Sequence, residues 1–358
     1  MESPDDHKKH KIADSIPIIS LFCGAGGLDL GFNQSGFRTI LAIDNNPAAC
    51  RTFTLNHPTC HVLKRDLSTV HRRYIVDRIS ELPLEDVPVG IIGGPPCQAF
   101  SVSNVHKKDN DVRSLLPSHY ASHLAVLRME LDIDFFVFEN VPGLRSRNHD
   151  TLFTELKGLF EQAGFIIKEE ILDAQDFGVP QRRRRIFVVG FNRKKHPNIS
   201  FSFPNSSQQV PVTVRDVLGN LPDPAYFSRD LKVDQIAFHP NHWCMRPRSP
   251  KFQNGHLTRE GNGNKGRPFR VLEWDSPSPT VAYGHREVHV HPSGKRRLSV
   301  YEAMLLQGFP HDYRLYGNLS EQITLISNAV PPPVGCALAE QIRKSLYASI
   351  NKKKTNVR

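Results

Sequence analysis

Residues 18–32, IISLFCGAGGLDLGF, decide the fold. An apolar, β-branched run ends at Phe22, and a glycine-rich turn leads from it into a helix-like segment. Glycine permits a tight turn and lets backbone N–H groups approach a ligand at the start of a helix. The stretch therefore predicts the first strand, a ligand-binding turn and the first helix of an open α/β sheet.

Four further apolar runs continue this pattern along the first half of the chain. They are residues 39–43, 89–92, 135–138 and 186–189, and helix-length segments alternate with them. Continuous apolar runs are typical of strands that are buried on both faces of a parallel sheet. We therefore expect a doubly wound α/β core in which the ends of several strands meet at one edge.

The sequence between residues 195 and 275 has a different texture. It is rich in Pro, Asn, Gly and Arg and loses strong periodicity, so we expect a separate lobe dominated by loops. Regular structure returns with the capping box SVYE at 299–302, which opens a helix that stops before Gly308 and Pro310. A last amphipathic helix is expected at 334–346, followed by a solvated, disordered tail.

Composition narrows the class of protein. The 358 residues carry a formal charge of +10, which favours a polyanionic partner but does not by itself establish one. No run of roughly 18 apolar residues predicts a membrane span, and the N-terminus does not resemble a secretion signal. Six cysteines without CxxC spacing predict reduced thiols in a cytosol rather than a zinc cluster or a disulfide framework.

The predicted edge of the sheet carries an acid suited to a nucleoside. Asp44 lies 20 residues after Gly24 (44 − 24), at the end of the second run, where a carboxylate can accept hydrogen bonds from ribose hydroxyls. Asp29 stands where a dinucleotide motif has its third glycine, and an acid there would repel a pyrophosphate. A nucleoside without phosphates fits better than NAD, and a glycine-rich turn without a ligand is the plainer alternative.

A thiol and a carboxylate end two other runs. Free cysteine is usually a small buried hydrophobe, and we assign that role to the other five cysteines. Cys97 instead follows two glycines and two prolines at the expected edge, which makes it a candidate nucleophile. Glu139 ends an apolar run, where a carboxylate is costly unless paired or used, and burial would raise its pKa toward a value useful for proton donation. A thiol beside such an acid suits addition to an electron-poor ring.

Four successive arginines begin the run QRRRRIFVVGF at 181–191. Strand alternation places Arg183 and Arg185 on one face and Arg182 and Arg184 on the other. One pair could offer fixed donors to a phosphate or a pyrimidine carbonyl. A solvated edge strand is an equally good interpretation of the residues alone.

These segments resemble, in order, the motifs of the DNA (cytosine-5) methyltransferases of the compact bacterial, restriction-modification type. The blocks are SLFCGAGGLDLGF, GGPPCQAFS, FENV, QRRRRIFVVGF, RRLSVYEAMLLQGFP and SNAVPPPV, and they cover nearly the whole chain outside 195–275. The resemblance implies a Rossmann-like, S-adenosylmethionine-dependent methyltransferase core with a smaller, irregular target-recognition lobe. The implied organisation is a catalytic and cofactor-binding domain at 1–194, a target-recognition domain at 195–275 and a segment at 276–358 that completes the catalytic domain.

The resemblance also implies a reaction. Cys97 would add to C6 of a cytosine flipped out of duplex DNA, while Glu139 protonates or hydrogen-bonds ring N3. Carbon 5 would then take the methyl group of S-adenosylmethionine, and loss of the C5 proton and of the thiolate would release 5-methylcytosine. Arg183 and Arg185 match the family's active-site arginines, and Arg185 is the better candidate for the pyrimidine O2. No metal ion is implied.

The implied cofactor pocket draws on both ends of the chain. Its residues are Phe22 for adenine stacking, Gly24 and Gly26 for backbone approach, Asp44 for the ribose, Asp66 for the adenine amino group, and Pro96, Asn328 and Val330. Ser327 stands where the family commonly has glycine, so its backbone must tolerate that conformation. Leu115 or Leu116 is also expected near the cofactor.

Double-stranded DNA is the implied partner. The residues expected to contact it are Gln98, Ser101, Arg246, Arg248 and Thr280, with further phosphate or guanine contacts offered by Lys251, Arg259, Lys265 and Arg267. The polar loop that begins at Ser101 is expected to close over the flipped base. We expect a monomeric cytoplasmic enzyme associated with the bacterial nucleoid, with a cognate restriction endonuclease as a candidate partner.

Three other functions fit part of the sequence. A nicotinamide-dependent oxidoreductase would share the α/β core but leaves Cys97, Glu139 and the arginine strand without a role. A non-catalytic DNA-binding relative would keep the basic lobe and lose a catalytic group, whereas the cysteine, the glutamate and both arginines are present. An RNA cytosine-5 methyltransferase is the closest alternative, and the long recognition lobe favours duplex DNA over it.

Overall fold

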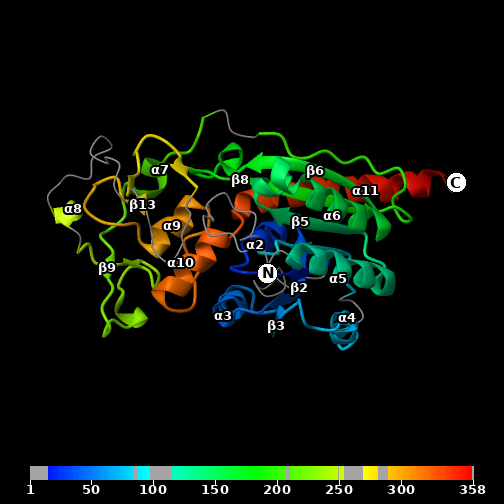
Figure 1. Cartoon of the computed structure of the whole chain (residues 1–358), viewed down its shortest axis with the longest axis horizontal. Coiled ribbons are helices and arrows are strands. Elements are labelled where there is room, and N and C mark those ends of the chain that lie inside the picture. The colour runs from blue at the N-terminus through cyan, green and yellow to red at the C-terminus, as the bar shows by residue number, and fades with distance from the viewer. Residues whose placement is uncertain are drawn as a thin grey trace, which may run out of the picture.

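The structure is a computed structural model that describes residues 15–83, 87–96, 115–206, 210–248, 250–253, 269–280 and 289–356. Within them, a seven-stranded sheet forms the centre of one half of the molecule (Figure 1). Its strands in spatial order are β3 (His61–Lys64), β2 (Phe37–Asp44), β1 (Ile16–Leu21), β4 (Gly90–Gly93), β5 (Phe135–Asn140), β8 (Arg184–Asn192) and β6 (Phe165–Asp173).

The direction of the strands differs from expectation at one place. The strands from β3 to β5 are parallel, as predicted, but β8 pairs antiparallel with both β5 and β6. Residues 174–183 join β6 to β8 and hold only η5 (Ala174–Phe177) and β7 (Gln181–Arg182). A parallel crossover needs a dozen or more residues, so this short connection reverses the chain. Strands β3 and β6 were not predicted, because polar residues interrupt their apolar runs.

Helices cover both faces of the sheet. One face packs against α4 (Arg73–Ile79), α5 (Leu116–Leu131) and α6 (Asp150–Gln162), and the other against α2 (Gly27–Gln34) and α11 (Pro332–Asn356). Strand β5 shows why both faces need cover: Phe136 and Phe138 join the first core, whereas Phe135 and Val137 join the second. The doubly wound fold follows from this two-sided burial.

Helices α2 and α11 pack closely through glycine. A Cβ on Gly31 would lie 2.3 Å from the carbonyl oxygen of Pro332 and 2.5 Å from the backbone nitrogen of Cys336. The C-terminal helix therefore lies on the first helix of the fold, and only a residue without a side chain fits between their backbones. This helix is also longer than expected: it continues to Asn356, so the expectation of a disordered tail is wrong up to that residue. No Gly or Pro follows Leu346 to stop it.

The other half of the molecule is built from short elements. They are α7 (Val214–Leu218), β9 (Ala225–Tyr226), β10 (Trp243–Cys244), α8 (Pro250–Gln253), β11 (Arg270–Val271), β12 (Ser278–Pro279), β13 (His289–Val290), α9 (Val300–Leu306) and α10 (Leu319–Asn328). The predicted capping box is confirmed, since Ser299 and Glu302 cap α9 reciprocally. Trp243, Tyr301 and Leu325 belong to one core, so this core draws residues from both sides of position 275. It also includes Ala25 of the glycine-rich turn.

The five cysteines within the described residues differ in burial. Cys23 and Cys244 are buried, but Cys50, Cys60 and Cys336 are only half-buried, so the expectation that all five are buried fillers is wrong for three. These three lie on helices or beside the edge strand β3 rather than inside the sheet.

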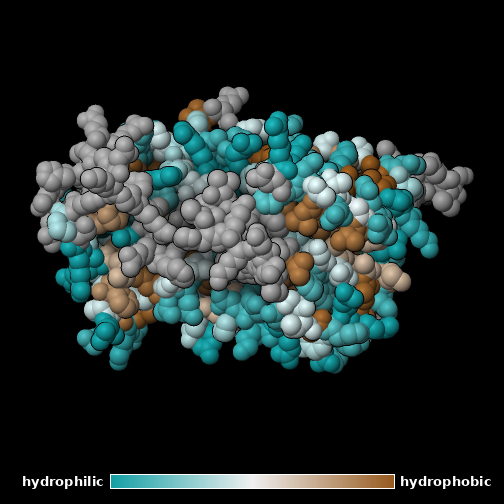
Figure 2. Space-filling model, in the orientation of Figure 1, coloured by the Kyte–Doolittle hydropathy of each residue, from teal (hydrophilic) through white to brown (hydrophobic). Residues whose placement is uncertain are grey.

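Figure 2 shows apolar residues in small separate groups on the face drawn, with hydrophilic residues between them. Within the described ranges, no helix is long and apolar enough to cross a membrane.

Candidate active site

The parallel strands bring four predicted segments to one edge of the sheet. Strands β1, β2, β4 and β5 are neighbours in register, and their carboxyl ends lead to Phe22, Asp44, Gly94 and Glu139. The predicted convergence of these segments is therefore confirmed. It follows from strand direction, because parallel strands all end at the same edge.

The glycine-rich turn has two different sides. Gly24 (φ +54°) and Gly26 (φ +75°) adopt left-handed conformations that favour glycine. A Cβ on Gly24 would meet no atom of the described residues within 4 Å, whereas a Cβ on Gly26 would lie 2.7 Å from the Tyr313 hydroxyl. The turn is thus open at Gly24 and packed against protein at Gly26. Phe22, with φ 56°, also adopts this conformation, which is strained for a residue with a side chain.

Asp44 fixes the shape of the turn. Its carboxylate accepts hydrogen bonds from the backbone N–H of Gly24 (3.0 Å) and of Asn46 (2.8 Å). Burial raises the pKa of Asp44, and these backbone donors act in the opposite direction. The acid therefore lies beside the open side of Gly24. Asp66 follows β3 and is exposed, and hydrogen bonds from Ser68 lower its pKa.

Asp29 points into the protein. It is buried in α2 and accepts a hydrogen bond from the Thr39 hydroxyl of β2 (3.0 Å). Burial raises the pKa of Asp29 to about 6. The acid at the third-glycine position thus bonds the adjacent strand, so repulsion of a bound pyrophosphate does not explain its presence.

Glu139 is a buried acid with an arginine partner. It is 7% exposed, and its Oε1 lies 3.1 Å from Nε of Arg185. Burial raises the pKa of Glu139, and the charges of Arg185 and Arg183 only partly oppose that effect. The direction of the pKa change expected from its place in the sequence is confirmed. A protonated carboxyl can donate a hydrogen bond or a proton to a bound base.

The loop that leads to Cys97 passes over this acid. A Cβ on Gly94 would lie 2.5 Å from Oε2 of Glu139, so a larger residue here would displace this carboxylate. The side-chain amide of Asn140 donates a hydrogen bond to the carbonyl oxygen of Pro95 (3.3 Å) and ties the loop to the end of β5. No role for Asn140 was predicted from the sequence. An amide directly after a strand-end acid is the signal that could have indicated one.

The four arginines divide as strand alternation predicts. Arg183 and Arg185 point inward, whereas Arg182 and Arg184 are exposed. Arg183 is 1% exposed and donates from Nη2 to the carbonyl oxygens of Ser327 (2.7 Å) and Ala329 (2.9 Å). Its Nε and Nη1 have no hydrogen-bond partner in the described part of the chain, and burial lowers its pKa. Arg185 thus holds Glu139, and Arg183 holds the segment after α10.

That segment closes the edge from the C-terminal side. A Cβ on Gly27 would lie only 2.1 Å from the carbonyl oxygen of Val330. The backbone of Val330 therefore packs directly against the start of α2. Asn328 ends α10 and is exposed. Ser327 lies inside α10, where its hydroxyl bonds the carbonyl oxygen of Thr324 (3.0 Å). A helical position needs no glycine, so the anticipated backbone difficulty at Ser327 does not arise.

The predicted DNA contacts are less closely grouped. The Thr280 hydroxyl donates to the carbonyl oxygen of Arg182 (2.7 Å), which places Thr280 beside the arginine strand. Arg246 is exposed, with its guanidinium 5.6 Å from the ring centre of Tyr226, and Arg248 is also exposed. Leu115 is exposed just before α5, which Leu116 begins. The other predicted site residues lie outside the described residues: Cys97, Gln98, Ser101 and its loop, Arg259, Lys265 and Arg267. Lys251 is described only as part of α8.

Comparison with solved structures defines the fold. A prophage-encoded protein of E. coli, described as a DNA modification methyltransferase, superposes with a TM-score of 0.75 at 24% identity, over 93% of this chain and all of that one. The Dnmt2 methyltransferase of S. pombe superposes with a TM-score of 0.63 at 17% identity, over 93% of this chain and 99% of that one. At these identities the likeness concerns the fold alone, and that fold is the methyltransferase fold.

Sequence relatives then define the family. The family model for C-5 cytosine-specific DNA methylase matches residues 16–344. Type II methyltransferase M.MthTI of Methanothermobacter thermautotrophicus is 34% identical over 94% of this chain and its own whole length. M.NgoPII of Neisseria gonorrhoeae is 30% identical over 92% of this chain and 96% of its own. The chain belongs to the C-5 cytosine-specific DNA methylase family and is a DNA cytosine-5 methyltransferase of the restriction-modification type. The oxidoreductase alternative is thereby excluded.

Proposed function

We propose that the protein transfers the methyl group of S-adenosylmethionine to C5 of one cytosine in a specific duplex DNA sequence, through a covalent adduct with Cys97. The observation that carries this proposal is the surroundings of Glu139. One of its oxygens is held by Arg185, and the other faces the Gly94 position of the loop that leads to Cys97. A nucleophile, an acid and an arginine therefore come from adjacent strand ends.

The edge beside the glycine-rich turn has the features of a nucleoside site. The turn is open at Gly24, and Asp44 and Val330 border the same turn from two sides. We assign the cofactor to Phe22, Gly24, Gly26, Asp44, Asp66, Pro96, Asn328 and Val330. When bound there, S-adenosylmethionine supplies a methyl group attached to a positively charged sulfur.

The residues of the chain then carry out the addition and the elimination. The target cytosine is flipped out of the duplex, since its ring faces are inaccessible while it is stacked. The Cys97 thiolate forms a bond to C6 while Glu139 gives a proton or a hydrogen bond to N3 and Arg185 donates to O2, so that C5 becomes nucleophilic. After C5 has gained the methyl group, N3 returns its proton to Glu139 and the C5 proton leaves to solvent. The electron pair of the C5–H bond reforms the C5–C6 double bond as the Cys97–C6 bond breaks, which restores the thiolate. Arg183 keeps the segment after α10 in place through its two carbonyl contacts.

The irregular lobe at 195–275 is the proposed reader of the DNA target. Exposed Arg246 and Arg248 lie in this lobe, and Thr280 lies just beyond it, beside the arginine strand. With Gln98 and Ser101 these residues would contact the duplex, and phosphate contacts would make binding weaken steeply with salt. We place the enzyme, as a monomer, in the cytoplasm on nucleoid DNA, with a restriction endonuclease of the same target as its partner.

Bisulfite sequencing tests the proposal directly. DNA from cells that express the chain should show protected cytosines in one sequence context, and DNA from cells that express Cys97→Ala should show none. The variant should still bind duplex DNA in a gel-shift assay, because the recognition lobe is unchanged. Absence of protected cytosines with the parent chain, or equal protection with Cys97→Ala, would show that the proposal is wrong.

A further inference from the structure

Residues 313–316 are part of the connection between α9 and α10, and Tyr313 and Leu315 belong to the same core as Ala25 and Trp243. At their start, the Tyr313 hydroxyl donates a hydrogen bond to the carbonyl oxygen of Ala25, inside the glycine-rich turn. Tyr313 is 4% exposed, and its ring packs 4.9 Å from that of Phe309 and 6.3 Å from that of His57, centre to centre. Because burial raises its pKa, the hydroxyl stays protonated and remains a donor.

The two peptide units after Tyr313 are held from opposite sides. The side chain of Asn56, at the end of α3 (Pro47–Asn56), accepts from the Arg314 N–H (3.0 Å) and donates to the Arg314 carbonyl oxygen (2.7 Å). The side chain of Asn241, in the irregular lobe, accepts from the Leu315 N–H (2.9 Å) and donates to the Leu315 carbonyl oxygen (2.8 Å). Consecutive residues are therefore clamped to the sheet half and to the target lobe.

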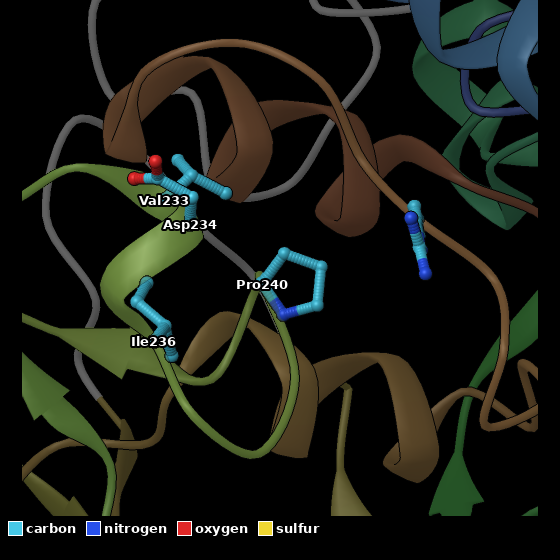
Figure 3. Close-up of a pocket in the computed structure, with 5 residues that line it drawn as sticks. Val233, Asp234, Ile236 and Pro240 are labelled. Atoms are coloured by element: carbon cyan, nitrogen blue, oxygen red, sulfur yellow. The ribbon is translucent and has the colours of Figure 1, made fainter.

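Asn241 is itself held in place by α9. It is fully buried, and its carbonyl oxygen accepts a hydrogen bond from the Tyr301 N–H of α9 (2.9 Å). Close by, the same lobe and Arg314 leave a pocket between them, lined by Val233, Asp234, Ile236 and Pro240 (Figure 3). Ile236 and Leu315 also belong to one core, so both the backbone clamp and side-chain packing join this segment to the lobe.

The clamp ends on the packed side of the cofactor turn. Ala25 lies between the two left-handed glycines, so the direction of its carbonyl sets how the turn presents its backbone on the open side. The Tyr313 hydroxyl occupies the space that a Cβ on Gly26 would need. A hydrogen bond at this point therefore favours one shape of the turn over the others that glycine allows.

We infer that Tyr313 is a positioning residue for S-adenosylmethionine, and that Asn241 fixes Tyr313 to the target-recognition lobe. The inference rests on the proposed function, because it takes the glycine-rich turn as the cofactor site. The Tyr313→Phe variant removes one hydrogen bond and keeps the ring. Loss of a typical buried hydrogen bond predicts that the Kd for the cofactor rises roughly three- to tenfold. The kcat at saturating cofactor should stay within about twofold, because Tyr313 does not touch the reacting atoms.

Calorimetric titration with S-adenosylmethionine in the absence of DNA measures this effect without turnover. Tyr316→Phe is the matched control: it removes the same atom from the same segment, but the Tyr316 hydroxyl contacts Arg51 at the surface. We expect its Kd to equal that of the parent chain, and we expect Tyr313→Phe to bind a DNA duplex normally. Equal cofactor Kd values for the two phenylalanine variants would overturn the inference.

Asn241 is tested in combination with Tyr313. Asn241→Ala should raise the cofactor Kd. The Kd of the double variant should not exceed the larger of the two single-variant Kd values, because both substitutions act through the contact of Tyr313 with the turn. Multiplied effects in the double variant would overturn the role of Asn241. If Asn241→Ala does not fold, Asn241→Ser keeps one hydrogen-bonding group and serves in the same cycle. A parent chain that binds DNA but no S-adenosylmethionine would instead overturn the proposed function.

Discussion

Two buried glutamates, each facing an arginine, occupy the two halves of the molecule. Glu302, in the first turn of α9, accepts hydrogen bonds from Nη1 (2.9 Å) and Nη2 (2.8 Å) of Arg296 and from the Ser299 N–H (2.7 Å). Glu139, at the end of β5, has one close contact, with Nε of Arg185 at 3.1 Å. Its Oε2 receives no hydrogen bond from the part of the chain that the structure describes.

The difference in hydrogen bonding separates a structural glutamate, Glu302, from one that is a candidate for catalysis, Glu139. The oxygens of Glu302 are both occupied by donors, so this carboxylate can only hold α9 and Arg296 in place. Glu139 keeps an oxygen available and a raised pKa, at the edge where four strand ends meet. A buried charge with filled partners contributes to folding, whereas one with an empty acceptor site is expensive to maintain and is a candidate for function.

The largest expected effect is on Glu302. Glu302→Ala should lower the free energy of unfolding by about 3 to 5 kcal/mol, because it leaves the buried Arg296 guanidinium without its main partner. Urea unfolding followed by circular dichroism measures this. Glu321→Ala is the control, since Glu321 closes the same kind of capping box on α10 in a solvent-accessible place. It should cost less than about 1.5 kcal/mol, and equal losses would contradict the distinction.

Asp29 is a third buried acid. In the folded protein its pKa is about 6, above the ordinary value of 3.8. The native state then binds the proton more tightly than the unfolded chain does. The contribution of Asp29 to the free energy of unfolding is therefore fully present below pH 3.8 and is lost as the pH rises through about 6, a loss of about 3 kcal/mol.

Urea unfolding between pH 4 and pH 7 measures this loss for Asp29. Asp29→Asn keeps the shape and an acceptor for Thr39 but does not titrate, so it should lack this part of the pH dependence. The same slope in both proteins would show that another group is responsible.

Glu139→Gln should affect catalysis and not folding. We expect single-turnover methylation to slow about 100-fold, roughly 2.7 kcal/mol, because the amide cannot give a proton to N3. The free energy of unfolding should change little, since glutamine keeps the size of the side chain and an oxygen that can accept from Nε of Arg185. Glu169→Gln, which weakens a surface ion pair with Lys157 on the same sheet, is the control and should methylate at the parent rate. Turnover of Glu139→Gln near the parent rate would remove its assigned role.

What the sequence could predict was local in character. Strand ends, the glycine-rich turn, the capping box at Ser299 and the alternation of the arginines each depend on a few neighbouring residues, and the structure confirms them. The direction of β8 could not be predicted, because an apolar run reads the same whether its strand is parallel or antiparallel. It depended on the short connection from β6, which has no apolar signal.

Contacts between segments that are distant in the chain also could not be predicted from the sequence. The Tyr313 hydroxyl meets Ala25 across 288 residues, and the Asn140 amide meets Pro95 across 45. Neither pair has a local pattern, since a tyrosine after a turn and an asparagine after a strand are ordinary residues. Only the fold brings them together, so the site could be predicted as a set of residues but not as a network of contacts.

The close fit of α2 against α11 has a consequence for synthesis of the protein. Val334 follows Leu28 by 306 residues (334 − 28), yet both belong to the same core. At a translation rate of about 5 to 20 residues per second, the first helix waits roughly 15 to 60 s for its cover. During that time Leu28 and Phe32 have no α11 to pack against, so this apolar side of α2 lacks part of its native cover. The methylating enzyme can therefore mature only after its last helix leaves the ribosome.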